Sequence, residues 1–126
     1  MAAGDTDPAR GMRLAARENL AAALLLLDRG YLRAAASRFY FSMFQAGVCA
    51  LERRGAEPPS SRDRYWSHET VWRLVRTLRD DPADALRFRD MRTMRLSGYY
   101  RVWKFHRRDL ERMKHDVRRF VEEVTE

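Results

Sequence analysis

Residues 35–46 read AASRFYFSMFQA, and this stretch decides the fold. It lies in the most apolar segment of the chain, residues 31–54, where large apolar side chains recur every three or four positions. That spacing predicts a helix, because side chains along a strand alternate with a period of two. Arg38, Ser42 and Gln45 occupy i, i+4 and i+7 and form a polar stripe on this helix. The stripe must face a cleft, a partner or another polar group; in the simplest alternative, Arg38 pairs with a carboxylate within the fold.

Apolar residues recur at helical spacing along the rest of the chain as well. The pattern predicts a first helix that begins at Pro8 and ends at Gly30, and a second helix over residues 31–54. A third helix should begin after Ser67, which caps it, and a fourth should run from Pro82 to about Leu96. The last predicted helix contains Leu110 and Val124. Residues 98–106 are either a loop or a helical continuation. Short connections make sequential helices antiparallel neighbours. We therefore expect residues 1–126 to form one all-α domain, an up-and-down antiparallel bundle of four to five helices, with residues 1–7 as a disordered tail.

The composition agrees with a helical domain. The 126 residues include no isoleucine and few other β-branched residues, which strands favour. The single cysteine, Cys49, excludes an intramolecular disulfide and lies in an apolar stretch, so we expect it to be buried. The chain contains no His or Cys cluster with metal-ligand spacing and no glycine-rich phosphate loop, so we expect no metal and no cofactor.

The longest apolar run and the first eight residues indicate where in the cell the protein is expected. The longest strongly apolar run, residues 20–27, is too short to cross a membrane. The first eight residues are polar and acidic, unlike a secretory signal. A cytoplasmic protein without a membrane partner is the expectation.

The second helix resembles that of the HEPN superfamily, whose pattern there is Ala-Ala-x-Arg-x-Tyr-Tyr-Ala-x-Phe-His-Ala. The matching residues are Arg38, Tyr40, Phe41, Phe44 and Ala46, whereas Ser42 stands in the place of Ala and Gln45 in the place of His. A further family landmark is a His that opens the third helix, and His68 in the stretch SHETV looks like it.

The resemblance implies a four- or five-helix bundle that forms a homodimer. Many family members are encoded beside a small nucleotidyltransferase as a toxin–antitoxin pair, and several are metal-independent endoribonucleases. Their active-site pattern places an Arg and then a His late in the fourth helix, facing the dimer mate. Such a pair can cleave RNA, because the His can take a proton from a ribose 2′-hydroxyl while the Arg holds the scissile phosphate.

The corresponding segment of this chain departs from that pattern. Arg92 stands in the Arg place, Ser97 in the His place and Tyr99 in the place of a Tyr that some members carry. A serine hydroxyl cannot act as a general base near neutral pH, so the ribonuclease motif is degenerate. Another branch of the family has Arg-x-x-Ala-Asp-Tyr, against which Arg95 and Tyr100 align. Both registers stay open.

Other Arg-to-His spacings of the required length occur elsewhere in the chain. Arg101 and His106 directly follow the fourth-helix segment and are the alternative catalytic pair, with Arg92 as a second choice of arginine. Two further spacings end at His68 and His115. With 23 Arg in 126 residues, such spacings are expected by chance. We expect His68 to lie in the first turn of its helix and His115 on a solvated face.

The net charge of +7 comes from one part of the chain. Residues 86–119 contain twelve basic and four acidic residues, and Tyr, Trp and Phe side chains are interleaved among them. Arginines with aromatics can grip a phosphate backbone and stack bases. The sequence therefore predicts a domain that binds RNA or nucleotide, or acts as partner or toxin of a nucleotidyltransferase pair. The alternatives are an active metal-independent endoribonuclease and a structural dimerisation module.

Overall fold

The computed structural model describes residues 9–58, 66–78 and 106–126 of the chain. This part contains the four helices α1 (Arg10–Asp28), α2 (Leu32–Arg53), α3 (His68–Leu78) and α5 (Arg107–Thr125), and no strand. The prediction of an all-α bundle is confirmed. The expected tail and the expected fourth helix lie outside the described residues.

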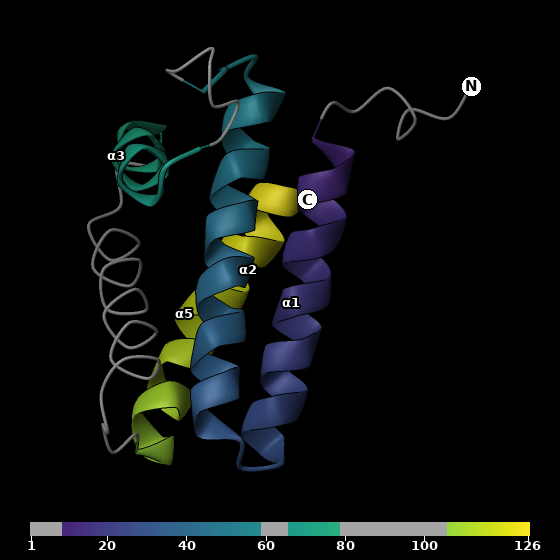
Figure 1. The fold of residues 1–126 in the computed structure, drawn as a ribbon, viewed down its shortest axis with the longest axis vertical. Helices are drawn as coiled ribbons and strands as arrows, with labels where there is room; N and C mark the ends of the chain where they lie inside the picture. Colours follow the sequence, from purple (N-terminus) through teal and green to yellow (C-terminus); the bar gives the residue numbers. More distant parts are fainter. Residues whose placement is uncertain (1–8, 59–65, 79–105) are drawn as a thin grey trace.

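Helices α1 and α2 form an antiparallel hairpin with a tight turn (Figure 1). The turn depends on Gly30, whose φ of 82° is a left-handed conformation that glycine adopts without steric cost. The Gly30 amide donates to the Leu27 carbonyl at 3.0 Å, and the Tyr31 amide donates to the Leu26 carbonyl at 2.9 Å. These two bonds form a Schellman motif, which satisfies carbonyls at the end of α1. The predicted end of the first helix at Gly30 is therefore confirmed.

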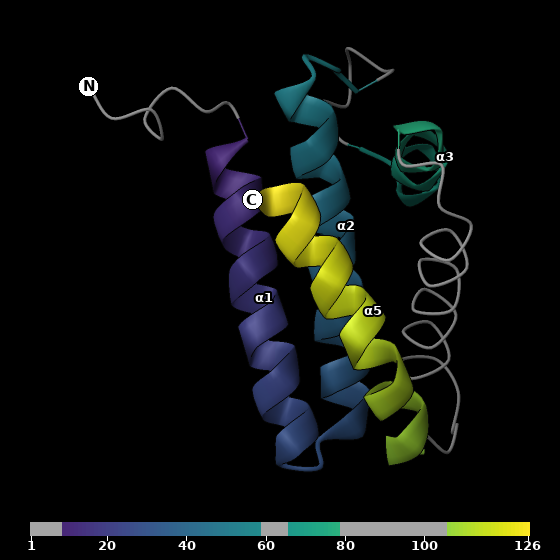
Figure 2. The ribbon, with the colours of Figure 1, turned by 180° about the vertical axis from the view of Figure 1, so that it is seen from behind.

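Helix α2 occupies the centre of the described part. It packs against α1, α5 and α3, and Figure 2 shows α5 crossing the face that α1 and α2 present together. More than half of its 22 residues are buried, including Phe39, Tyr40 and Met43. The lone Cys49 is buried, as predicted. An apolar helix that is covered on several sides buries most of its surface, which explains why its apolar residues are not confined to one stripe.

The helix ends match the expectations in most places. Gly55, with a φ of 78°, closes α2 through a second Schellman motif. The Ser67 hydroxyl accepts the Thr70 amide at 3.1 Å, which confirms Ser67 as the cap of α3. The first helix begins at Arg10, two residues later than predicted, with Ala9 at its N-cap. No helix in the described part of the chain is long and apolar enough to cross a membrane.

Candidate functional site

The two landmarks of the HEPN resemblance meet where α3 packs on α2. Tyr40 is fully buried in α2, and its hydroxyl is in hydrogen-bond contact with Nδ1 of His68, the first residue of α3. The two rings stack with their centroids 5.3 Å apart. Phe44, one turn further along α2, lies 4.5 Å from the same imidazole between ring centroids.

This cluster of Tyr40, Phe44 and His68 orients the imidazole. The two aromatic rings fix the plane of His68, and the hydroxyl satisfies Nδ1. Because a buried hydroxyl is costly without a partner, His68 also satisfies the polar end of Tyr40. The His68 residue as a whole is half-buried. His68 thus opens α3, as predicted, and is held there by α2.

The polar stripe of α2 faces α1. The Ser42 hydroxyl is buried and donates to the Ala16 carbonyl at 2.8 Å. The tip of the Gln45 amide lies 2.6 Å from the Asn19 side-chain nitrogen, and Arg38 Nη1 donates to Asn19 Oδ1 at 2.9 Å. The stripe therefore meets polar groups of the neighbouring helix.

Of the three partners considered for the stripe, the observed one is another polar group. The described partner of Arg38 is an amide, Asn19, rather than the carboxylate of the simplest alternative. The sequence also makes Arg38, Ser42 and Gln45 candidate binding residues, and that hypothesis stays a prediction. Asn19 was missed by sequence reasoning because a single Asn on an apolar helix has no distinguishing spacing.

Three arginines that sequence reasoning also missed hold the end of α5. Arg13 Nε donates to the Thr125 carbonyl at 2.8 Å, and Arg17 Nε donates to the buried Thr125 hydroxyl at 3.0 Å. Arg53 Nη1 donates to the Glu126 carbonyl at 2.8 Å. Cations at a helix C-terminus stabilise its unpaired carbonyls and its dipole. These contacts join residues more than 70 positions apart, so no local pattern predicts them.

The candidate catalytic residues are only partly described. His106 is the exposed N-cap of α5, and its carbonyl accepts the Asp109 amide at 3.0 Å. His115 is exposed on α5, as predicted. The remaining candidates lie outside the described residues: Arg92, Arg95, Ser97, Tyr99, Tyr100 and Arg101. The distance from His106 to an arginine of the motif therefore stays untested.

An exposed row of basic residues runs along the outer side of α5. Its members are spaced at i, i+4, i+7 and i+11, and we call them the basic ridge: Arg108, Arg112, His115 and Arg119. The first three form no hydrogen bond or ion pair with the part of the chain that the structure describes. Arg108, Arg112 and His115 therefore present donors that can meet an anion.

The remaining basic side chains of α5 are in ion pairs on one flank of the ridge. Lys114 Nζ lies 2.6 Å from one Glu111 carboxylate oxygen, and Arg107 Nε lies 3.6 Å from the other. The hydrogen bond from Lys114, helped by the charge of Arg107, holds the pKa of Glu111 below its ordinary value of 4.5. Arg118 pairs with Glu122 at 3.0 Å. These three cations are engaged within the helix.

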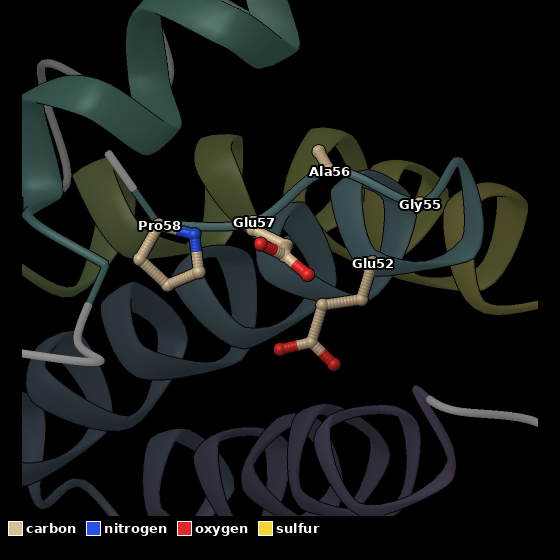
Figure 3. Close-up of a pocket in the computed structure, with 5 residues that line it drawn as sticks. All are labelled: Glu52, Gly55, Ala56, Glu57 and Pro58. Carbon is tan, nitrogen blue, oxygen red and sulfur yellow. The ribbon is translucent and has the colours of Figure 1, made fainter. Parts of the chain in front are cut away.

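A shallow hollow of about 340 Å³ lies beside the end of α2 (Figure 3). It is lined by Glu52, Gly55, Ala56, Glu57 and Pro58. Two carboxylates alone do not make a metal site, and among the described residues no group of three or more potential metal ligands occurs. The residues that line the hollow therefore indicate no ligand or reaction.

A comparison with models of known protein families finds none that matches this chain, and a comparison with curated proteins finds no match either. The likeness to the HEPN superfamily therefore rests on the residues of the chain alone.

Proposed function

We propose that this chain is a helical domain of the HEPN type that binds RNA without cutting it. The observation that carries the proposal is the contact between Tyr40 and His68. These residues are the Tyr of the second-helix pattern and the His that opens the third helix, and they lie 28 positions apart in the sequence. If the likeness in these two separate segments arose by chance, the two matching side chains would not be expected to touch.

The basic ridge of α5 supports RNA as the ligand. Successive members are three or four residues apart, and the ridge from Arg108 to Arg119 is about 16 Å long at 1.5 Å per residue. That length suits several consecutive phosphates of one strand, and arginine presents a planar fork of donors to each phosphate. To bind phosphates in this way, no ion pair within the described residues has to be broken at Arg108, Arg112 or His115.

The absence of cleavage follows from the fourth-helix segment of the sequence. Where family members with ribonuclease activity have a histidine, this chain has Ser97. A serine hydroxyl stays protonated near neutral pH and cannot remove the proton of a ribose 2′-hydroxyl. The basic surface then serves for binding alone.

The binding test uses fluorescence anisotropy with a labelled single-stranded RNA over a series of salt concentrations. We expect affinity to fall steeply with salt, because phosphate contacts release counterions. In the variant Arg108→Ser/Arg112→Ser the slope of log K against log salt should fall by about 1.4, or about 0.7 for each phosphate contact of a single strand. The matched control is Arg54→Ser/Arg73→Ser, which removes the same charge from exposed positions at the C-cap of α2 and on α3.

The binding test separates the proposed surface from the proposed function. Weaker binding in the ridge variant than in the control supports the proposal, and equal affinities refute the ridge as the binding surface. No RNA binding by the unchanged protein at low salt refutes the proposed function.

The cleavage test incubates the protein with total RNA in EDTA beside a His106→Ala variant. We expect intact RNA in both. Cleavage that the variant lacks would instead establish the alternative, an endoribonuclease in which His106 is the base.

A further inference from the structure

Tyr31 has the highest exposure among the large apolar and aromatic side chains of the described residues. It is 64% exposed and lies in the turn between α1 and α2. Its hydroxyl forms no hydrogen bond, and its ring no aromatic contact, with the part of the chain that the structure describes. A residue that follows a Schellman motif commonly packs back on the preceding helix, but this ring leaves most of its surface in water. The core of the bundle therefore does not account for an aromatic residue at this position.

The backbone of Tyr31 is held on both sides. Its amide donates to the Leu26 carbonyl at 2.9 Å, and its carbonyl accepts the Ala35 amide at 2.9 Å. Tyr31 is the N-cap of α2, yet its side chain forms no capping hydrogen bond. Ser, Thr, Asp or Asn at an N-cap would stabilise the helix, because their side-chain oxygen accepts a free amide. Capping therefore does not account for Tyr31 either, and the fixed backbone presents its ring to solvent at a defined place.

Arginines lie around this ring. Arg29 and Arg33 are two residues before and two residues after Tyr31, and both are exposed. The Arg29 side chain forms no hydrogen bond or ion pair with the described residues. From α5, Arg107 Nη2 donates to the Asp28 carbonyl at 3.3 Å, which joins the beginning of α5 to the turn. Figure 2 shows the turn and the beginning of α5 at the same end of the bundle.

The basic ridge begins beside this contact. Arg108, its first member, directly follows Arg107 in the chain. Asp28 and Tyr31 are three residues apart, so their Cα atoms are separated by at most about 11 Å. Residues 28–33 contain two arginines and one acidic residue, so the turn adds positive charge to that of the ridge. An exposed aromatic ring thus lies at the end of the bundle where the basic ridge begins.

We propose that Tyr31 stacks on a base of single-stranded RNA whose phosphates lie along the basic ridge, so that the domain prefers single-stranded RNA to duplex RNA. The inference rests on the proposed function. The base faces of a single strand are accessible, whereas neighbouring base pairs cover those of a duplex. Every base has a π-face, so the preference is for strandedness rather than for sequence. Arg29 beside the ring supplies a cation for a phosphate next to the stacked base.

The first test compares affinities by fluorescence anisotropy with a labelled single-stranded RNA and with the duplex of the same sequence. Tyr31→Ala should weaken binding of the single strand about 5- to 150-fold, the effect of replacing a stacking aromatic by alanine. The slope of log K against log salt should stay unchanged, because no phosphate contact is removed. Tyr31→Phe keeps the ring and should bind as the unchanged protein does. The matched control is Leu25→Ala, which shortens another exposed side chain and should also leave the affinity unchanged.

The first test distinguishes this inference from the proposed function. Full affinity in Tyr31→Ala, beside weaker binding in Arg108→Ser/Arg112→Ser, overturns the stacking role and leaves the proposed function standing. Equal affinities of the unchanged protein for single-stranded and duplex RNA also overturn the inference alone. No RNA binding by the unchanged protein refutes both.

The second test removes the bases instead of the ring. A single-stranded oligomer of ribose phosphates without bases offers the same phosphates and nothing on which to stack. The unchanged protein and Tyr31→Ala should therefore bind this oligomer equally. A loss of affinity in Tyr31→Ala as large as that for the complete RNA would show that the ring acts through the phosphates or the fold, and would overturn stacking.

The third test uses the unchanged protein, so it does not depend on how a variant folds. Single-stranded RNA that contains 5-iodouridine is irradiated in the complex, because this base crosslinks to an aromatic ring stacked on it. Mass spectrometry of the digested protein should find the crosslink at Tyr31, and the corresponding duplex should give none there. Crosslinks confined to other residues would overturn the inference.

Discussion

Replacing Tyr40 by Phe removes one oxygen atom from the contact between α2 and α3. The aromatic ring and its buried apolar area stay, so the change isolates the hydrogen bond with His68. The cost is that of leaving a half-buried imidazole nitrogen without this partner, about 1–2 kcal/mol. For a chain of 126 residues, that corresponds to a fall in Tm of roughly 3–10 °C.

His68→Ala is a stronger perturbation at the same contact. It removes the ring contacts with Tyr40 and Phe44 and leaves the fully buried Tyr40 hydroxyl without this partner. We expect a loss of about 2–4 kcal/mol in the free energy of unfolding. The double variant Tyr40→Phe/His68→Ala should cost less than the sum of the single variants, by about 1 kcal/mol, because the hydroxyl and its partner are removed together.

The measurement is urea denaturation followed by circular dichroism and by tryptophan fluorescence. Two of the three tryptophans are Trp66, two residues before α3, and Trp72 within it. Tyr31→Phe is the matched control, since the same atom is removed from a side chain that is 64% exposed. It should change stability by less than about 0.5 kcal/mol. The reasoning is refuted if Tyr40→Phe is as stable as the unchanged protein, or if the two single effects add in the double variant.

Two further predictions concern α5. The pKa of Glu111 is lowered by Lys114 and then by Arg107, so the carboxylate contributes stability above its ordinary pKa of 4.5 and loses that contribution as the pH falls. Glu111→Gln should therefore flatten the acid side of a plot of Tm against pH at low salt, and an unchanged plot would contradict the pairing. Arg13→Ala removes a donor from the Thr125 carbonyl and should cost about 0.5–1 kcal/mol, with faster amide hydrogen exchange confined to the last turns of α5. Equal exchange rates in the variant and the unchanged protein would show that Arg13 does not hold this end.

The helices and their ends could be predicted from local sequence because their causes are local. Gly30 and Gly55 end helices since they adopt positive φ at no steric cost, and the Ser67 hydroxyl reaches an amide three residues away. The start of the first helix was predicted less accurately, at Pro8 instead of Arg10, because the observed N-cap, Ala9, has no capping side chain that a sequence pattern could reveal.

For the candidate site, the sequence predicted individual residues but not the contacts between them. Tyr40 and His68 were each singled out by the sequence, one for a pattern in its helix and the other for its place at the start of the next. Nothing in their spacing predicted that the hydroxyl and the imidazole would touch. Similarly, the spacing of Arg38, Ser42 and Gln45 predicted a polar stripe, but not that Asn19 and the Ala16 carbonyl would meet it.

The sequence by itself determined that this protein is helical, where two of its turns lie, and that its positive charge is concentrated in residues 86–119. These properties follow from side-chain periodicity, glycine conformation and composition, all of which act over a few residues. Only the tertiary structure decided which side of α1 is buried, which arginines hold the end of α5, and what the polar stripe of α2 contacts. Those outcomes depend on how helices distant in the sequence pack together, since packing decides which side of each amphipathic helix is removed from water.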